Sequence, residues 1–203
     1  RAVLKTASCV SGNIFPDFLG LVRDADPSMT ALFMSRLAKN DFLARNTDGS
    51  FSFAHDRIQE AAYGTIPPTE RAALHRRIGG MMLRLCGDNL DGRIFEIADQ
   101  FNRAGHGDLD SAALKELVEI NRTAGMKAKS SAAFDAAAHY FGNAISIMKH
   151  CPGPAERPQH YSLHRFHAEC LYLNGEFDRA EEEICKALHY ADSEFQKAEI
   201  NNV

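Results

Sequence analysis

The feature that most constrains the fold is a spacing pattern that occurs twice in the second half of the chain. In each copy, seven residues follow one another at intervals of 3, 4, 2, 3, 4 and 3 positions. Intervals of three and four place residues on one face of a helix, and the interval of two marks a turn. Each copy therefore predicts a helical hairpin. The two sets are Gly125, Ala128, Ala132, Phe134, Ala137, Phe141, Ala144 and Ala168, Leu171, Gly175, Phe177, Ala180, Ile184, Ala187.

This series resembles the tetratricopeptide repeat (TPR), a family of stacked helical hairpins. Small residues let two antiparallel helices approach closely, and large residues fill the groove of the neighbouring pair. The two copies lie 43 residues apart, compared with about 34 in the usual repeat. A proline-containing loop over 150–158 explains the excess, and 193–203 is expected to be the first helix of a third unit. The segment 110–203 is therefore predicted to form TPR-like repeats, the last one truncated.

The segment 1–66 has a different pattern. Three helical runs are followed by two short apolar runs that flank Asp48-Gly49, a good hairpin signal. Another helix follows, and Pro67-Pro68 closes the segment. Ser28 is a candidate N-cap for the third helix. Three helices followed by a hairpin are the outline of a winged helix, and 67–109 is expected to be a helical linker. The predicted fold class is thus mainly α, a winged helix with a short β-hairpin followed by a TPR-like solenoid.

Composition narrows the class of protein. Apolar residues make up 45% and charged residues 25%, which is typical of globular domains and unlike disordered chains. The chain has no stretch of ~20 apolar residues, so we expect no membrane span. Five cysteines without a CxxC pair indicate reduced thiols, a cytoplasmic location and no structural zinc site. The chain opens at Arg1 within an amphipathic run, so we interpret it as a fragment of a longer protein.

Charge argues against nucleic-acid binding. The net charge is −4, and the segment 1–66 is neutral, without the concentrated basic charge that DNA binding requires. The candidate recognition helix carries only Arg36 and Lys39 as cations. No phosphate-binding loop, GxSxG, HExxH or GxGxxG motif is present, so we expect no catalytic residues and no catalytic activity from this chain.

A longer motif suggests a family. The string Phe-x-Phe-x-His-Asp-Arg-Ile-Gln-x-Ala-Ala-Tyr at 51–63 resembles the region that follows the ATPase core in signal-transduction ATPases with numerous domains (STAND), in particular in multidomain bacterial kinases. The resemblance extends over nearly the whole chain. It implies a winged helix that packs on the chain's own ATPase core, with helical repeats that receive a protein partner or a neighbouring signalling domain.

The same resemblance implies a nucleotide contact. In STAND proteins the histidine of a Met-His-Asp motif contacts the β-phosphate of ADP, and Ala54-His55-Asp56 occupies the corresponding position with alanine in place of methionine. His55 is thus a candidate β-phosphate contact, and Asp56 a supporting residue that caps the helix or holds the imidazole. Bound ADP or ATP is expected only in the parent protein. The alternative is that His55 merely caps a helix or bonds a local carbonyl.

Other polar residues have ordinary interpretations. His160, His164 and His167 share one helix face, which suits either a metal or a plain polar face, and the plain face is favoured because no carboxylate partner is evident. Cys170 and Cys185 are expected to be buried packing residues. The basic cluster around His75 is expected to be solvated.

Three functions compete. The first is non-catalytic regulation of a nucleotide-driven switch. The second is a TPR-type interaction scaffold without nucleotide contact. The third is DNA binding by the winged helix, which the charge disfavours.

Overall fold

The computed structural model describes residues 1–87, 89–90, 92–107, 109–151 and 157–200. Within them the chain is mainly helical, with one two-stranded antiparallel sheet, which confirms the mainly α prediction. Contacts divide the chain into two compact units, residues 1–105 and 106–203. The helices of the segment expected to be a linker belong to the first unit up to Gly105.

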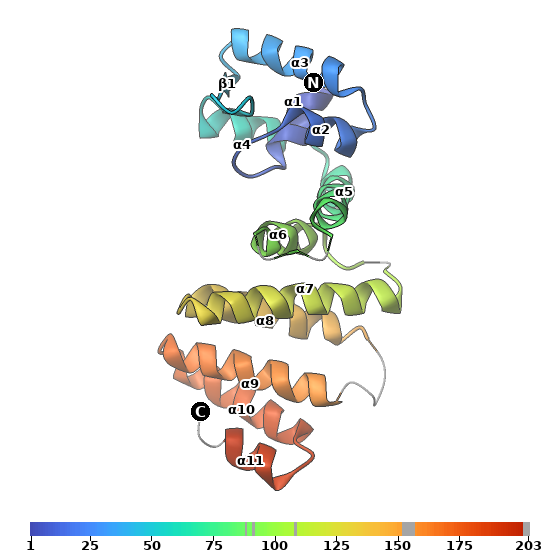
Figure 1. Cartoon of the computed structure of the whole chain (residues 1–203). Helices are drawn as coiled ribbons and strands as arrows, with labels where there is room; N and C mark the ends of the chain where they lie inside the picture. Colours follow the sequence, from blue (N-terminus) through green and yellow to red (C-terminus); the bar gives the residue numbers. More distant parts are fainter. Residues whose placement is uncertain (88, 91, 108, 152–156, 201–203) are drawn as a thin grey trace. The chain divides into compact units, whose positions relative to one another are not determined.

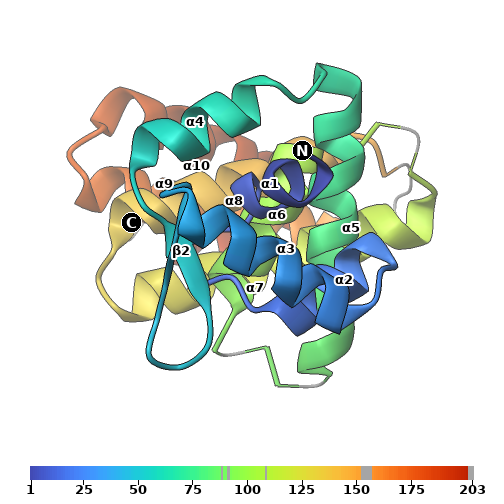
Figure 2. The same cartoon turned by 90° about the horizontal axis from the view of Figure 1, so that it is seen from above.

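The first unit contains six helices and two strands among its described residues. In chain order the two strands follow α3 and precede α4, and Figure 2 shows them as a hairpin that leads into α4. Proline begins three of these helices, where its missing N–H costs nothing. The elements are α1 (Ala2–Ser8), α2 (Pro16–Arg23), α3 (Pro27–Lys39), β1 (Leu43–Arg45), β2 (Phe51–Phe53), α4 (Asp56–Gly64), α5 (Pro68–Cys86) and α6 (Ile94–Ala104).

The predicted hairpin is present. Strands β1 and β2 pair antiparallel, with Arg45 opposite Phe51. Gly49 adopts φ 83° in the turn, a conformation that glycine reaches without steric cost. Asp48 fixes the turn because its carboxylate accepts hydrogen bonds from the backbone N–H and the hydroxyl of Ser50, at 3.0 and 2.6 Å. Residue Ile14 adds a further backbone bridge to Phe51.

The start of α3 differs from the prediction. Asp26, rather than Ser28, is the N-cap, and its carboxylate accepts a hydrogen bond from the backbone N–H of Met29 at 2.9 Å. Pro27 takes the first helical position. Because proline favours that position and the cap precedes it, the cap is the residue before the proline.

The second unit consists of helices connected in sequence. Figure 1 shows α7–α8 and α9–α10 as successive pairs. Contacts run from α7 to α8, α8 to α9, α9 to α10 and α10 to α11, which is the neighbour-to-neighbour pattern of stacked hairpins. The helices are α7 (Ser111–Ser130), α8 (Phe134–Met148), α9 (Arg157–Leu173), α10 (Phe177–Tyr190) and α11 (Glu194–Ile200). Pro152 and Pro154 of the expected loop, and the end of 193–203, lie outside the described residues.

The two turns within these hairpins match. Ala132 and Gly175, which are equivalent in the repeated pattern, both have positive φ, at 56° and 80°. The backbone N–H after each one bonds a carbonyl five residues earlier, from Ala133 to Ala128 at 3.0 Å and from Glu176 to Leu171 at 2.9 Å. This pairing closes a helix with a left-handed residue. The repeated spacing therefore corresponds to repeated geometry.

Small residues of the pattern form the contact between paired helices. Ala137, Ala144 and Ala187 are fully buried, and so is Phe141. The Phe141 ring lies against Gly125 of α7 and stacks on Phe166 of α9 at a centroid distance of 5.6 Å. The large ring thus fills the space that the small residues leave, as the spacing predicted.

Candidate functional site

His55 lies where β2 gives way to α4. It occupies the N-cap position with extended backbone, and its carbonyl accepts the hydrogen bond of the Ile58 N–H at 2.9 Å. Its side chain is exposed and makes no capping hydrogen bond. The imidazole is therefore not used as a helix cap. Asp56 is the first helical residue, one position past the cap, where a carboxylate interacts favourably with the helix dipole.

Other residues of the same motif have structural roles. Gln59 on α4 donates from its amide to the carbonyls of Ser8 and Val10, at 3.2 and 3.3 Å, around the C-terminus of α1. Ser8 is the last residue of α1 and Val10 lies just past its C-cap, so a side chain from another helix satisfies these carbonyls at the helix end. Tyr63 bonds the buried His75. Within the motif, His55, Asp56 and Arg57 form a continuous exposed segment at the start of α4, and Glu60 and Ala61 are exposed further along the helix.

His75 corrects a sequence-based expectation. It was placed in a solvated basic cluster, but it is fully buried. Its Nε2 lies 3.0 Å from the Tyr63 hydroxyl and its Nδ1 2.7 Å from the Gln100 Oε1, while the Gln100 amide donates to the Cys9 carbonyl at 2.9 Å. Burial lowers the pKa of His75, although the bond to Gln100 opposes the shift. This network ties α1, α4, α5 and α6 together.

The exposed face of α3 is apolar. Met29, Leu32 and Phe33 are exposed at helical spacing, and the guanidinium of Arg36 lies over the Phe33 ring. A face that binds DNA phosphates is instead rich in lysine and arginine. The surface of this helix therefore does not favour nucleic-acid binding.

Two of the three histidines on α9 surround a carboxylate. Glu183 of α10, buried beside them, lies with its Oε2 2.6 Å from the Nδ1 of His164 and 3.3 Å from the Nδ1 of His167. Lys186 donates to the other oxygen of Glu183 at 2.6 Å. Sequence reasoning missed Glu183 because it is 19 residues from His164 and on another helix.

The electrostatics of this cluster favour an ionised carboxylate. Burial acts to raise the pKa of Glu183, but the hydrogen bonds from His164 and Lys186, together with the nearby His167 ring, outweigh it and hold the pKa well below the ordinary value. In turn, the bond to Glu183 raises the pKa of Lys186. Because an ionised carboxylate only accepts hydrogen bonds, the Nδ1 of His164 carries the proton that it donates. Among the described residues, no group of three or more His, Cys, Asp or Glu side chains is arranged to hold a metal.

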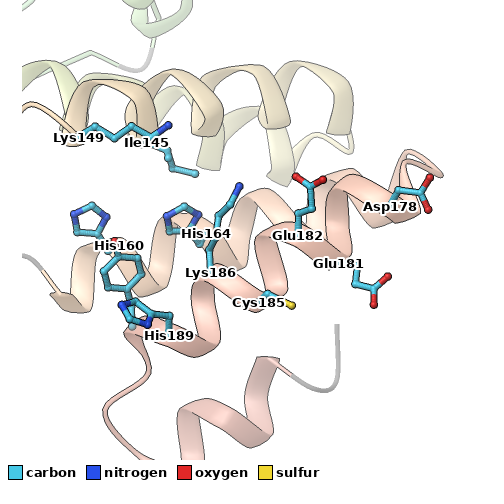
Figure 3. Close-up of a pocket in the computed structure, with 11 residues that line it drawn as sticks. Ile145, Lys149, His160, His164, Asp178, Glu181, Glu182, Cys185, Lys186 and His189 are labelled. Carbon is cyan, nitrogen blue, oxygen red and sulfur yellow. The ribbon is translucent and has the colours of Figure 1, made fainter.

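A pocket opens beside this cluster, between α8 and α10 with α9 as its floor. Its volume is about 870 Å³, within the ~300–1,000 Å³ that ligand sites usually have. Figure 3 shows Ile145 pointing from α8 into it, and Glu182 and Lys186 pointing from α10 toward α8. The lining residues are Ile145, Lys149, His160, His164, Asp178, Glu181, Glu182, Cys185, Lys186, His189 and Tyr190.

The aromatic part of this pocket is ordered by stacking. The rings of His160 and Tyr190 stack with centroids 4.5 Å apart, and those of His164 and Tyr190 at 5.6 Å. Three nearly parallel rings from α9 and α10 therefore form one end of the pocket. A second pocket, of about 290 Å³, also lies between α8 and α10 and includes His167.

The cysteines divide into two groups. All five are free thiols. Cys170 is buried as predicted, and burial raises its pKa to about 11, which leaves it unreactive. Cys185, also predicted to be buried, is exposed at the pocket instead. The prediction for Cys185 was wrong because its side of α10 faces the pocket rather than a neighbouring helix.

Comparison with known proteins identified no relative of this chain. No family model, no curated protein and no solved structure matches the chain. Within the part of the chain that the structure describes, no helix has both the length and the apolar character needed to cross a membrane.

Proposed function

We infer that this chain is a non-catalytic regulatory and interaction region of a cytoplasmic, nucleotide-regulated signalling ATPase of STAND type. In this proposal the first unit is a winged helix that packs on the ATPase core. The second unit is a TPR-like solenoid that receives a protein partner or a neighbouring domain. A signal of this kind shifts a switch only through its different affinity for the two states.

The observation that carries the proposal is the position of His55. Its imidazole is exposed at the N-terminus of α4 and is not used to cap that helix. A helix N-terminus favours anions, and a protonated imidazole beside it would donate a charge-assisted hydrogen bond to a phosphate oxygen. The order of helices and hairpin in the first unit agrees with the winged-helix proposal.

The test uses the full-length protein that contains this chain. We expect wild-type protein to retain ADP through purification, and His55→Ala to lose most of it. His139→Ala, which changes another exposed histidine on α8, serves as the control and should retain the wild-type amount. Nucleotide quantified by chromatography after denaturation gives the readout. Equal retention by the wild type and His55→Ala, or no nucleotide in either, would reject the switch.

A second candidate function is a TPR-type interaction scaffold that makes no nucleotide contact. The pocket between α8 and α10 favours it, because stacked helical repeats build extended surfaces that bind other proteins. This function would remain if His55→Ala had no effect on bound nucleotide.

A further inference from the structure

The pocket between α8 and α10 combines an apolar part with an excess of carboxylates over lysines. Ile145 of α8 and the stacked Tyr190 of α10 supply apolar surface. Lys186 brings mainly its methylene stem, because its ammonium group is bonded to Glu183 at 2.6 Å. The surface that a partner meets here is thus apolar in its middle.

Three carboxylates, those of Asp178, Glu181 and Glu182, line the pocket together with two lysines, Lys149 and Lys186. Because Lys186 is already paired with Glu183, the charge of Lys149 is the lysine charge left to balance them. Among the described residues, no salt bridge within 4.0 Å holds any of these three carboxylates, although the charge of Glu182 helps to raise the pKa of Lys186. Figure 3 shows Glu182 turned toward α8 and Glu181 turned away. The charges therefore favour a cationic partner and disfavour an acidic one.

We propose that this pocket docks a basic amphipathic segment of a partner protein. Apolar side chains of the segment pack on Ile145 and Tyr190, and its lysine or arginine side chains pair with Glu182 and Asp178. The proposal rests on the inferred role of the second unit as a protein-binding module, and it names the surface and the partner's chemistry. It does not depend on the nucleotide contact of His55.

The test measures binding of two probe peptides to the whole chain by fluorescence anisotropy. Both are about 18 residues long with leucine at helical i, i+3, i+4 spacing, and the other positions are lysine in one peptide and glutamate in the other. We expect the lysine peptide to bind at least about tenfold more tightly than the glutamate peptide, with affinity that falls as salt rises. Equal affinity of the two peptides, or no binding of either, would overturn the proposal.

A pair of charge reversals locates the binding. Glu182→Lys at the pocket should lower the affinity for the lysine peptide about tenfold. Glu116→Lys makes the same change on the exposed face of α7, and its effect should stay below about twofold because it lies outside the pocket. Both positions are exposed, so circular dichroism should show folded variants. Equal effects of the two reversals would contradict a site at this pocket.

A cysteine footprint gives an independent readout. Cys185 is exposed at the pocket, and the partly exposed Cys86 lies in the first unit. Bound lysine peptide should slow iodoacetamide alkylation of Cys185 several-fold and leave Cys86 unchanged, as mass spectrometry would show. If the lysine peptide binds without protecting Cys185 and without sensitivity to Glu182→Lys, this proposal fails while a protein-binding role through another face survives.

Discussion

Gly125 on α7 lies so close to Phe141 on α8 that a Cβ at residue 125 would be 2.7 Å from the Cε1 atom of the ring. Real Cβ atoms do not approach a ring so closely, so an alanine there forces the buried ring or the helix to move. We expect Gly125→Ala to lower the free energy of unfolding by about 1–3 kcal/mol. Chemical denaturation followed by circular dichroism measures it.

Gly142 provides the opposite control. It also lies inside a helix, but a Cβ there would meet only the His167 ring at 3.6 Å, an ordinary contact. Alanine is the better helix former, so Gly142→Ala should stabilise the second unit by about 0.5–1 kcal/mol. Adding Phe141→Leu should remove part of the cost of Gly125→Ala. If Gly125→Ala and Gly142→Ala both raised or both lowered the free energy of unfolding, this would contradict the close packing of α7 on α8.

The two hairpin turns predict another pair of opposite effects. Ala132 has φ 56°, where glycine is favoured, and its equivalent Gly175 has φ 80°. A residue with a Cβ is strained at positive φ, so Ala132→Gly should be more stable than wild type by about 1 kcal/mol. For the same reason, Gly175→Ala should be less stable by about the same amount. Thermal unfolding of both variants checks this. A destabilised Ala132→Gly would show that the turn does not hold the left-handed conformation.

The buried cluster on α9 and α10 predicts unequal effects for two adjacent glutamates. Glu183→Gln removes the charge that His164 and Lys186 bond, and it should cost about 1–3 kcal/mol. Glu182→Gln, at an exposed position, should change stability by less than about 0.5 kcal/mol. Hydrogen exchange of α9 and α10 would measure both.

The pH dependence of the Glu183 effect has a definite sign. Its pKa is lower in the folded state than the ordinary value of 4.5. The ionised carboxylate therefore contributes its full stability above pH 4.5 and loses it as the pH falls toward the folded pKa. The difference between wild type and Glu183→Gln should accordingly be largest above pH 4.5 and shrink on acidification. If the stability difference between wild type and Glu183→Gln did not change with pH, Glu183 would not be ionised in the folded protein.

His75 predicts a pH effect on the first unit. Its folded pKa lies below the ordinary value of 6.5, so the unfolded chain binds the proton more readily. Stability is complete above pH 6.5 and falls below it until the folded pKa is reached, by at most about 1.4 kcal/mol per pH unit. Hydrogen exchange of α5 and α6 should show this loss, and His75→Gln, which does not titrate, should lack it.

Local patterns predicted much of the fold. The Asp48-Gly49 hairpin and the paired helices of the second unit follow from residues close together in the chain, since turns and helix faces depend on near neighbours. The start of α3 was misplaced by two residues because Ser28 and Asp26 are both good caps, and the position of Pro27 decides between them.

The side-chain environments were decided by tertiary structure. The amide of Gln100 donates to the carbonyl of Cys9, 91 residues away, while its carbonyl oxygen bonds the buried His75. Glu183 meets His164 because two helices pack face to face. Sequence alone determined which segments are helical, which turn, and which faces are apolar. Packing determined which polar groups are buried together and which cysteine is exposed, because such contacts join residues that no local spacing relates.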